Sequence, residues 1–254
     1  MTSFRISLSF LVAFGIFGTT SCRSTGDRLE VPTPARAEFV AQRISCVFAT
    51  GVEHVILGGY LTRLDGDVEG LILASTDGGR AWRRLGSETH PMRGLIIQSI
   101  HFNDALRGWL GGVRVQDGQT IPVLLRTEDG GGHWREAEVP ETRAAVVVSV
   151  SELKFETDEE GSLLVVFQEE SAEDLTANQY FSRDAGRSWT LGDFMTDPDA
   201  QVTDPGAMFV TQAQGYRIQP PLENGTQVLE YTGSSGDYWI PRAQLGLTQF
   251  DLYY

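Results

Sequence analysis

The apolar residues of this 254-residue chain fall into short runs separated by turn residues, a pattern typical of β-strands. Representative runs are Gly70–Ala74, Leu95–Phe102, Ile121–Arg126, Val146–Val150 and Gln227–Tyr231. Helical periodicity is scarce, and the 28 glycines suit a chain that turns often. The pattern predicts an all-β fold.

Three octets share one frame: a hydroxyl residue, a spacer, Asp, a spacer, Gly, two spacers and Trp. The framed residues are Ser75, Asp77, Gly79 and Trp82, then Thr127, Asp129, Gly131 and Trp134, then Ser182, Asp184, Gly186 and Trp189. A degenerate fourth copy keeps Thr232, Gly236 and Trp239, with Ser234 in place of Asp. Asp and hydroxyl side chains close turns by accepting backbone N–H bonds, and Gly takes a positive φ. Each octet therefore predicts a hairpin tip whose Trp starts the returning strand and is buried between sheets.

The octets recur at a nearly constant spacing. The Asp positions advance by 129 − 77 = 52 and 184 − 129 = 55 residues, and Ser234 follows after 234 − 184 = 50. Periods of roughly 40 to 50 residues are those of four-stranded propeller blades. The expected blades run from about Arg43 to Ser87, Arg93 to Pro140, Ala144 to Asp193 and Gly206 to Arg242. We expect a small β-propeller of about four four-stranded blades over residues 43–254.

The frame resembles the Asp-box, or BNR, repeat of β-propellers. A second motif, Phe102–Gly112, contains Gly108-Trp109 and Gly111-Gly112 after a short polar turn, and His54–Gly59 keeps part of it. Together the motifs resemble the repeat of photosystem II assembly or stability factor-like propellers, over roughly residues 44–239. The resemblance implies a role in the assembly or stability of a membrane-associated complex. Asp-boxes alone do not decide activity, because enzymes, adhesins and scaffolds all contain them.

The N-terminus has the pattern of a secretory signal. Residues 1–21 hold one basic residue, Arg5, and an apolar run, Ile6–Gly18, that is too short for a membrane span. Cys22 follows small residues, which resembles the lipobox of bacterial lipoproteins, so we expect lipidation of Cys22. Cleavage near Ala35-Arg36-Ala37, with secretion, and an uncleaved anchor are the alternatives. The expected location is the bacterial cell envelope, either the outer membrane or the periplasmic side of the inner membrane.

Residues 22–42, with Pro32 and Pro34, are predicted to form a semi-extended tether. The second cysteine, Cys46, lies in an apolar strand pattern and is predicted to be a buried, inert thiol.

The formal net charge is −14, and it becomes −15 when Arg5 leaves with the signal (−14 − 1 = −15). Nucleic acid phosphates and anionic lipid surfaces should repel such a chain, so we expect no nucleic acid partner.

The positions of the octets predict which edge of the propeller would bind a partner. If each octet joins the third and fourth strands of a blade, the opposite edge holds the loops between strands two and three and the connections between blades. The candidate binding face there comprises Arg63, Asp65, Asp67, Arg93, Asp117 and Arg143. This face looks acidic with a few arginines. It is either a set of solvated loops or a platform for a cation or a basic segment of a partner.

Enzymatic and metal sites are not supported. The histidines His54, His90, His101 and His133 are scattered, without zinc-ligand spacing. Tyr216–Gln219 is only faintly similar to a sialidase element, and glycoside hydrolysis generally needs two opposed carboxylates. We expect no catalytic residue, metal or cofactor.

The expected function is therefore non-enzymatic recognition, by a scaffold that binds another envelope protein or a basic peptide segment. The alternatives are an Asp-box carbohydrate-active hydrolase such as a sialidase-like glycosidase, and an adhesion or structural module that uses Leu245–Tyr254 as an exposed edge.

Overall fold

The computed structural model describes residues 39–86, 92–116, 118–140, 145–169, 175–195 and 207–246. The chain divides into two units, Met1–Arg36 and Ala37–Tyr254, and all the described residues belong to the second. The predicted signal peptide, Cys22 and residues 22–38 of the tether lie outside the described residues. Within the described ranges, no helix has the length and apolar character needed to cross a membrane.

Four antiparallel sheets make up the described part, each built from four consecutive strands. The first contains β1 (Phe39–Ala49), β2 (Val55–Arg63), β3 (Val68–Ser75) and β4 (Arg83–Arg84). The second contains β5 (Leu95–Phe102), β6 (Gly108–Gln116), β7 (Gln119–Thr127) and β8 (Arg135–Glu136). The third contains β9 (Ala145–Phe155), β10 (Gly161–Glu169), β11 (Leu175–Ser182) and β12 (Thr190–Met195). The fourth contains β13 (Ala207–Phe209), β14 (Gly215–Ile218), β15 (Gln227–Thr232) and β16 (Ile240–Leu245). The prediction of an all-β, propeller-like fold of four four-stranded sheets is confirmed.

Two predicted boundaries are wrong, both because an apolar end residue extends a strand. β1 begins at Phe39, before the expected start at Arg43, and Phe39 pairs with Arg63. β16 continues past Arg242 to Leu245, which pairs with Gln227. Phe39 and Leu245 are both buried in the core between the first and fourth sheets. Residues 247–254 lie outside the described residues.

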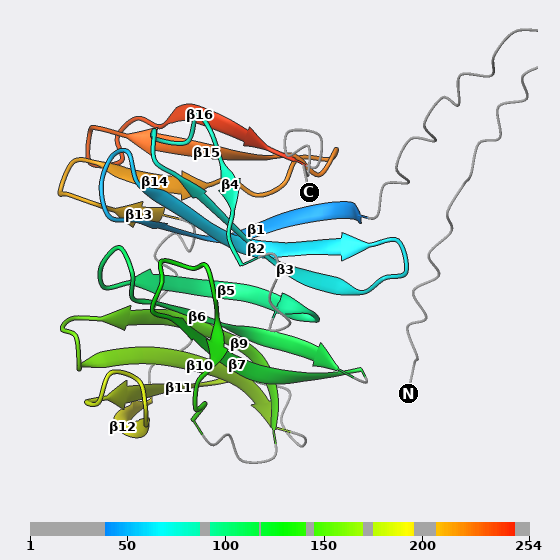
Figure 1. Ribbon diagram of the computed structural model, residues 1–254, viewed down its shortest axis with the longest axis vertical. Coiled ribbons are helices and arrows are strands. Elements are labelled where there is room, and N and C mark those ends of the chain that lie inside the picture. The colour runs from blue at the N-terminus through cyan, green and yellow to red at the C-terminus, as the bar shows by residue number, and fades with distance from the viewer. Residues whose placement is uncertain are drawn as a thin grey trace, which may run out of the picture. The chain divides into compact units, whose positions relative to one another are not determined.

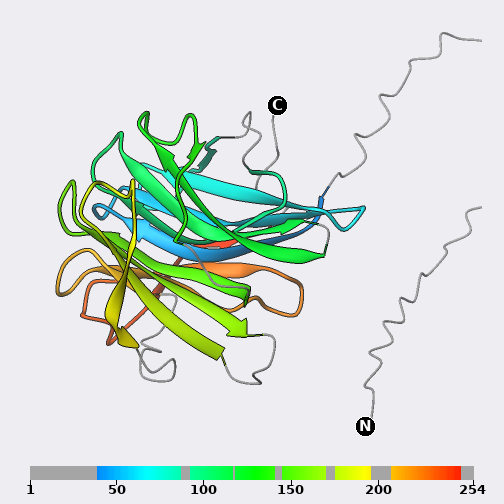
Figure 2. The same cartoon turned by 90° about the horizontal axis from the view of Figure 1, so that it is seen from below.

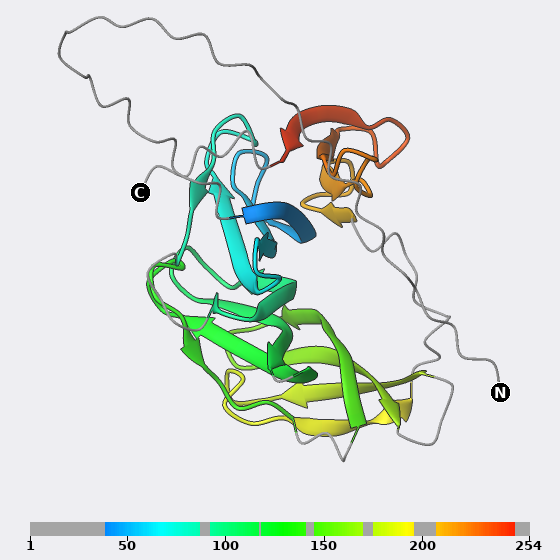
Figure 3. The same ribbon diagram turned by 90° about the vertical axis from the view of Figure 1, so that its right-hand side faces the viewer.

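The sheets follow one another in space as fourth, first, second and third, which keeps the neighbours first–second–third of the sequence order and places the fourth sheet against the first. One core joins the fourth sheet to the first, a second joins the first to the second, and a third joins the second to the third. In the described part of the chain, no buried cluster joins the third sheet to the fourth. Figures 1 and 3 show this order, from β13–β16 through β1–β4 and β5–β8 to β9–β12. Figure 2 shows the first and second sheets alongside each other from below.

Polar contacts fix the fourth sheet to the first. The buried side chain of Gln227 accepts from the N–H of Ile44 at 2.6 Å and donates to the Ile44 carbonyl at 2.9 Å. The hydroxyl of Tyr216 donates to the carbonyl of Val52, and the Tyr216 side chain is fully buried. These groups are satisfied only when the two sheets are in contact, so the contact has a defined register.

The octets fold as the sequence predicts. The hydroxyls of Ser75, Thr127 and Ser182 accept from the N–H of Gly79, Gly131 and Gly186 at 2.8, 3.0 and 2.8 Å. The same hydroxyls donate to Asp77, Asp129 and Asp184 at 2.8, 2.8 and 2.9 Å. Each Asp carboxylate also accepts a backbone N–H four residues later, from Ala81, His133 and Ser188. In the fourth copy the Ser234 hydroxyl accepts the N–H of Tyr238 at 3.0 Å, so a neutral acceptor replaces the carboxylate.

The octet glycines bring each corner against the sheet before it. Gly131 has a φ of 88°, and a Cβ built there would lie 2.9 Å from Leu85 of the first sheet. At Gly186 a Cβ would lie 2.7 Å from Trp109 of the second sheet, and at Gly79 it would lie 3.0 Å from Leu229 of the fourth. The octets therefore both close hairpins and dock neighbouring sheets.

The octet tryptophans are not equivalent. Trp134 is buried in the core between the first and second sheets, and Trp82 and Trp189 pack against the other two cores. Trp239 is partly buried and packs on Phe209 and Arg217 of its own sheet. The prediction that every octet tryptophan is buried between sheets is therefore wrong for Trp239.

The first strands of the first three sheets meet at His101. Its ring lies 5.1 Å from that of Phe48 and 6.0 Å from that of Phe155, centroid to centroid, and its Nε2 accepts the Phe155 N–H at 3.3 Å. Burial lowers the pKa of His101 to about 4. The imidazole is therefore neutral at pH 7, where it can accept this bond.

We expect acidification to weaken the fold through His101. An unfolded histidine has a pKa of about 6.5, so the unfolded chain binds this proton first and the stabilisation is lost as the pH falls from about 6.5 to 4. Because the ring is partly exposed, solvent screening limits the loss to about 1 to 2 kcal/mol. Urea unfolding at a series of pH values, compared with His101→Gln, measures it. A difference between the two proteins that is independent of pH would contradict the assignment.

Candidate functional site

The ends of the strands form two edges of the molecule, which carry different loops and turns. On the octet edge, each octet donates a backbone N–H to the turn between the first and second strands, as Gly78 does to Glu53 and Gly130 to Leu106, at 2.9 and 2.8 Å. The opposite edge, called here the loop edge, contains the β2–β3 loop next to the start of β5 and the end of β6. The predicted division is confirmed for the octets and the hairpin loops, while the connections between sheets at residues 87–91, 141–144 and 196–206 lie outside the described residues.

The loop edge contains a groove of about 330 Å³ between the first and second sheets. Asp67 lines one side, and Arg93 and Arg114 line the other. The walls are joined by backbone bonds, from Gly94 to Val68 at 2.8 Å and from Val115 to Gly94 at 2.9 Å. The structure thus brings together the predicted face residues Asp67 and Arg93, and Arg63 and Asp65 belong to the same β2–β3 hairpin.

In the described part of this face, arginines lie beside the carboxylates; the predicted acidic character of the whole face stays a prediction, because several of its acidic loops lie outside the described residues. Arg63 lies 3.8 Å from Asp65, and Arg84 lies 2.5 Å from Glu69. Arg114, which sequence analysis did not select, lies 2.6 Å from Glu136. The described part of the face is therefore of mixed charge. The predicted face residues Asp117 and Arg143 lie outside the described residues.

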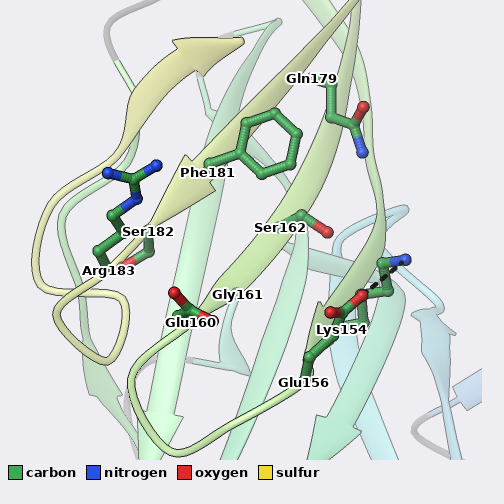
Figure 4. A pocket seen from close by; sticks show the side chains of 9 residues that line it. All are labelled: Lys154, Glu156, Glu160, Gly161, Ser162, Gln179, Phe181, Ser182 and Arg183. Carbon is green, nitrogen blue, oxygen red and sulfur yellow. Dashed lines mark ion pairs between the residues drawn. The ribbon is translucent and has the colours of Figure 1, made fainter.

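A second groove, of about 230 Å³, lies on the third sheet. Figure 4 shows its lining, with the Phe181 ring beside Ser162 and Gln179, and with Lys154 and Arg183 on opposite sides. Lys154 forms an ion pair with Glu156 at 3.6 Å. An aromatic ring among charged and amide groups suits contact with a polypeptide.

Sequence analysis missed this groove, although its cause is visible in the repeat. Ser162 is paired with Phe181, the residue directly before the octet hydroxyl Ser182. At the same position, the second sheet has Trp109 and the fourth has Tyr216, and both are buried against a neighbouring sheet. The sequence signal for this groove was therefore a small residue, Ser162, at a position where two other repeats have a large aromatic residue.

Four aspartates of the described part are held firmly in their charged form. Asp77, Asp104, Asp129 and Asp184 all have lowered pKa values, to about 2 for Asp104 and Asp184. Hydrogen bonding is the cause, led by the Arg107 N–H at Asp104 and by the Ser188 hydroxyl at Asp184. Carboxylates that hold their charge so firmly are poor proton donors at neutral pH. Among the described residues, no three His, Cys, Asp or Glu side chains are grouped as a metal site would require.

The thiol of Cys46 packs against the core between the first and second sheets. Burial raises its pKa to about 12, so it remains protonated at neutral pH. This agrees with the prediction of an inert thiol.

No family model and no curated protein matches the chain. A protein of unknown function from Dyadobacter fermentans is 16% identical, with a TM-score of 0.46 over 73% of this chain and 55% of that one. YCF48 bound to a D1 peptide is 13% identical, with a TM-score of 0.39 over 83% and 88%. An α-L-arabinofuranosidase from Fusarium graminearum is 13% identical, with a TM-score of 0.44 over 80% and 60%. This chain thus spans less than two thirds of the Dyadobacter and Fusarium proteins, and likenesses this distant carry no argument about activity.

Proposed function

We propose that this protein is a non-enzymatic recognition or assembly module of the bacterial cell envelope, anchored by a lipid on Cys22. The loop-edge groove binds a segment of another envelope protein. The observation that supports this most is the groove itself, which is open, is lined by Asp67, Arg93 and Arg114, and is built on backbone bonds between two packed sheets. A site held by sheet framework is pre-organised, and pre-organisation reduces the ordering cost of binding.

The charges of the groove favour a particular kind of segment. Asp67 on one wall and Arg93 on the other allow a bound chain to place a basic group and an acidic group a few residues apart. Charge complementarity of this kind sets specificity and register more than affinity. The resemblance of the octets and the Gly-Trp and Gly-Gly motif to assembly-factor propellers points to the same class of function.

Site-specific photo-crosslinking in the envelope tests this proposal. We expect a photoreactive amino acid at position 67 or 93 to give one and the same crosslinked protein, and Asp67→Lys with Arg93→Glu to abolish its capture by the module. The control position is Asp237, an exposed residue of the fourth octet on the other edge. Equal crosslinking from position 237, or none from 67 and 93, would show that the groove is not the binding site.

The hydrolase alternative has its own test. We expect purified protein to release no product from aryl glycosides of sialic acid and arabinose. Turnover that disappears in Asp65→Asn or Asp67→Asn, with the fold retained, would replace recognition by glycoside hydrolysis as the function of the loop edge.

A further inference from the structure

We propose that two copies of this chain form a closed dimer, in which the third sheet of each copy packs against the fourth sheet of the other. The inference is independent of the loop-edge function, because it concerns the flat faces of the sheets. It follows from positions that the repeat makes equivalent: each sheet has a forward face, directed to the next sheet in the spatial order, and a rear face, directed to the previous one.

The forward faces are compared at one cross-strand pair, which contains the residue directly before each octet hydroxyl. The four pairs are Ile56–Ala74, Trp109–Arg126, Ser162–Phe181 and Tyr216–Tyr231. The first, second and fourth pairs contribute residues to the three cores between sheets. The third pair instead lines the groove of Figure 4, where the Phe181 side chain is 38% exposed.

The forward face of the third sheet has further exposed apolar side chains beyond this pair. Strand register places Leu175 opposite Gln168, and Val146 also opposite Gln168, on the face that carries Phe181. Leu175 and Val146 are 45% and 55% exposed. Leu164 and Val166, on the same face of β10, are partly buried. Polar residues such as Gln168 and Gln179 alternate with these apolar ones, so the face is mixed, with exposed apolar side chains of the kind found at interaction surfaces.

The rear face of the fourth sheet carries an exposed aromatic residue that the forward face of a second copy would cover. In the second, third and fourth sheets, Phe102, Phe155 and Phe209 meet Trp134, Trp189 and Trp239 edge-on at 6.0, 6.1 and 6.0 Å. Phe155 is buried because Trp109 of the preceding sheet stacks on it at 5.1 Å. Phe209, in the same position, is 45% exposed. A forward face that carries Phe181 supplies the aromatic group that this position receives in the other sheets.

Both faces are more polar than the contacts within the chain. Ser162 stands where the second sheet has Trp109. On the rear face of the fourth sheet, Arg217 and Glu230 form an ion pair at 2.7 Å at a position where the second sheet pairs Leu110 with Leu125. Polar groups around an aromatic centre are typical of interfaces between chains that fold separately, because each chain must stay soluble before it associates.

The pairing of unlike faces determines the assembly. A contact between two different patches forms either a closed ring or a filament. Two copies contain twice the four sheets of one chain, and the resulting eight lie at the upper limit of the roughly 4 to 8 blades that propellers have. A ring closed by two copies, with two equal contacts, falls within that range.

Sedimentation equilibrium of the processed protein with Cys22→Ser, which carries no lipid, tests the dimer. We expect twice the mass of one chain at micromolar concentration. Phe181→Glu and Phe209→Glu should each weaken association by roughly 30-fold or more, because each alters both contacts of the ring. The matched control is Leu106→Glu, in a turn on the octet edge with 58% exposure, which should remain dimeric. Because Phe181 and Phe209 are both partly exposed, the variants should fold, and far-ultraviolet circular dichroism checks this.

Mixing the two variants identifies the pairing. A Phe181→Glu copy keeps an intact rear face and a Phe209→Glu copy keeps an intact forward face, so the mixture should regain one contact and form a heterodimer. A monomeric parent protein, a dimer that survives Phe209→Glu, or a mixture that stays monomeric would each overturn the proposal. None of these outcomes affects crosslinking from positions 67 and 93, so this proposal and the loop-edge function fail separately.

Discussion

Trp134→Ala should lower the free energy of unfolding by about 3 to 5 kcal/mol, because it removes a large ring from a core that has little freedom to collapse. The Trp134 side chain is 3% exposed and packs edge-on against Phe102. Its loss also removes the wall against which Gly86 and Gly131 are placed, since built Cβ atoms there would lie 2.8 and 3.4 Å from the indole. Urea unfolding measures the change.

Trp239→Ala is the control, because Trp239 has the same place in the repeat but a different environment. It is partly buried against Phe209 and lies under the Arg217 guanidinium at 4.5 Å. We expect a loss of about 1 kcal/mol in the monomeric Phe181→Glu background, where no second copy covers it. Equal losses for Trp134 and Trp239 would contradict the sheet order.

Gly112→Ala should cost about 3 kcal/mol, close to the largest effects of overpacking. A Cβ at Gly112 would lie 2.2 Å from the carbonyl oxygen of Ile96, which belongs to the backbone of β5 beside a register shift between Ile97 and Ser99. A backbone atom cannot rotate away as a side chain can, so the strands must separate. Glycine is required at position 59 for the same reason, because a Cβ there would lie 2.0 Å from the Arg43 carbonyl oxygen.

Gly51→Ala provides the comparison for this prediction. Gly51 lies in the turn after β1, where a Cβ would meet no atom within 4 Å. Its replacement should change the stability by less than about 0.5 kcal/mol. Each glycine variant adds one methyl group to the same parent protein, at a different position. Similar stabilities of the two variants in thermal unfolding would contradict the close approach of β5 and β6 at Gly112.

The sequence predicted those features that depend on residues near one another in the chain. Hydroxyl, Asp and Gly at fixed spacing determine the octet corners through local hydrogen bonds, and the second sheet's strands follow from apolar runs such as Leu95–Phe102. The degenerate copy was recognised because Thr232 and Gly236 keep the frame while Ser234 supplies the acceptor.

The sequence left open whether the fourth sheet packs on the first, because that contact depends on pairs far apart in the chain. Gln227 and Ile44 are 183 residues apart, and Tyr216 and Val52 are 164 apart, with no local pattern to link them. The ion pairs of the loop edge were not predicted for a related reason. Arg84 and Arg114 lie in strands, and their ion pairs with Glu69 and Glu136 appear only when the strands are paired.

Hydrogen exchange of the Gln227→Ala protein tests most directly whether the fourth sheet packs on the first. Loss of the Gln227 amide frees the N–H and carbonyl of Ile44, so exchange should accelerate in β1 as well as in β15, while β9 and β10 remain unchanged. Acceleration in β9 and β10, with β1 still protected, would place the fourth sheet against the third and contradict the order found here.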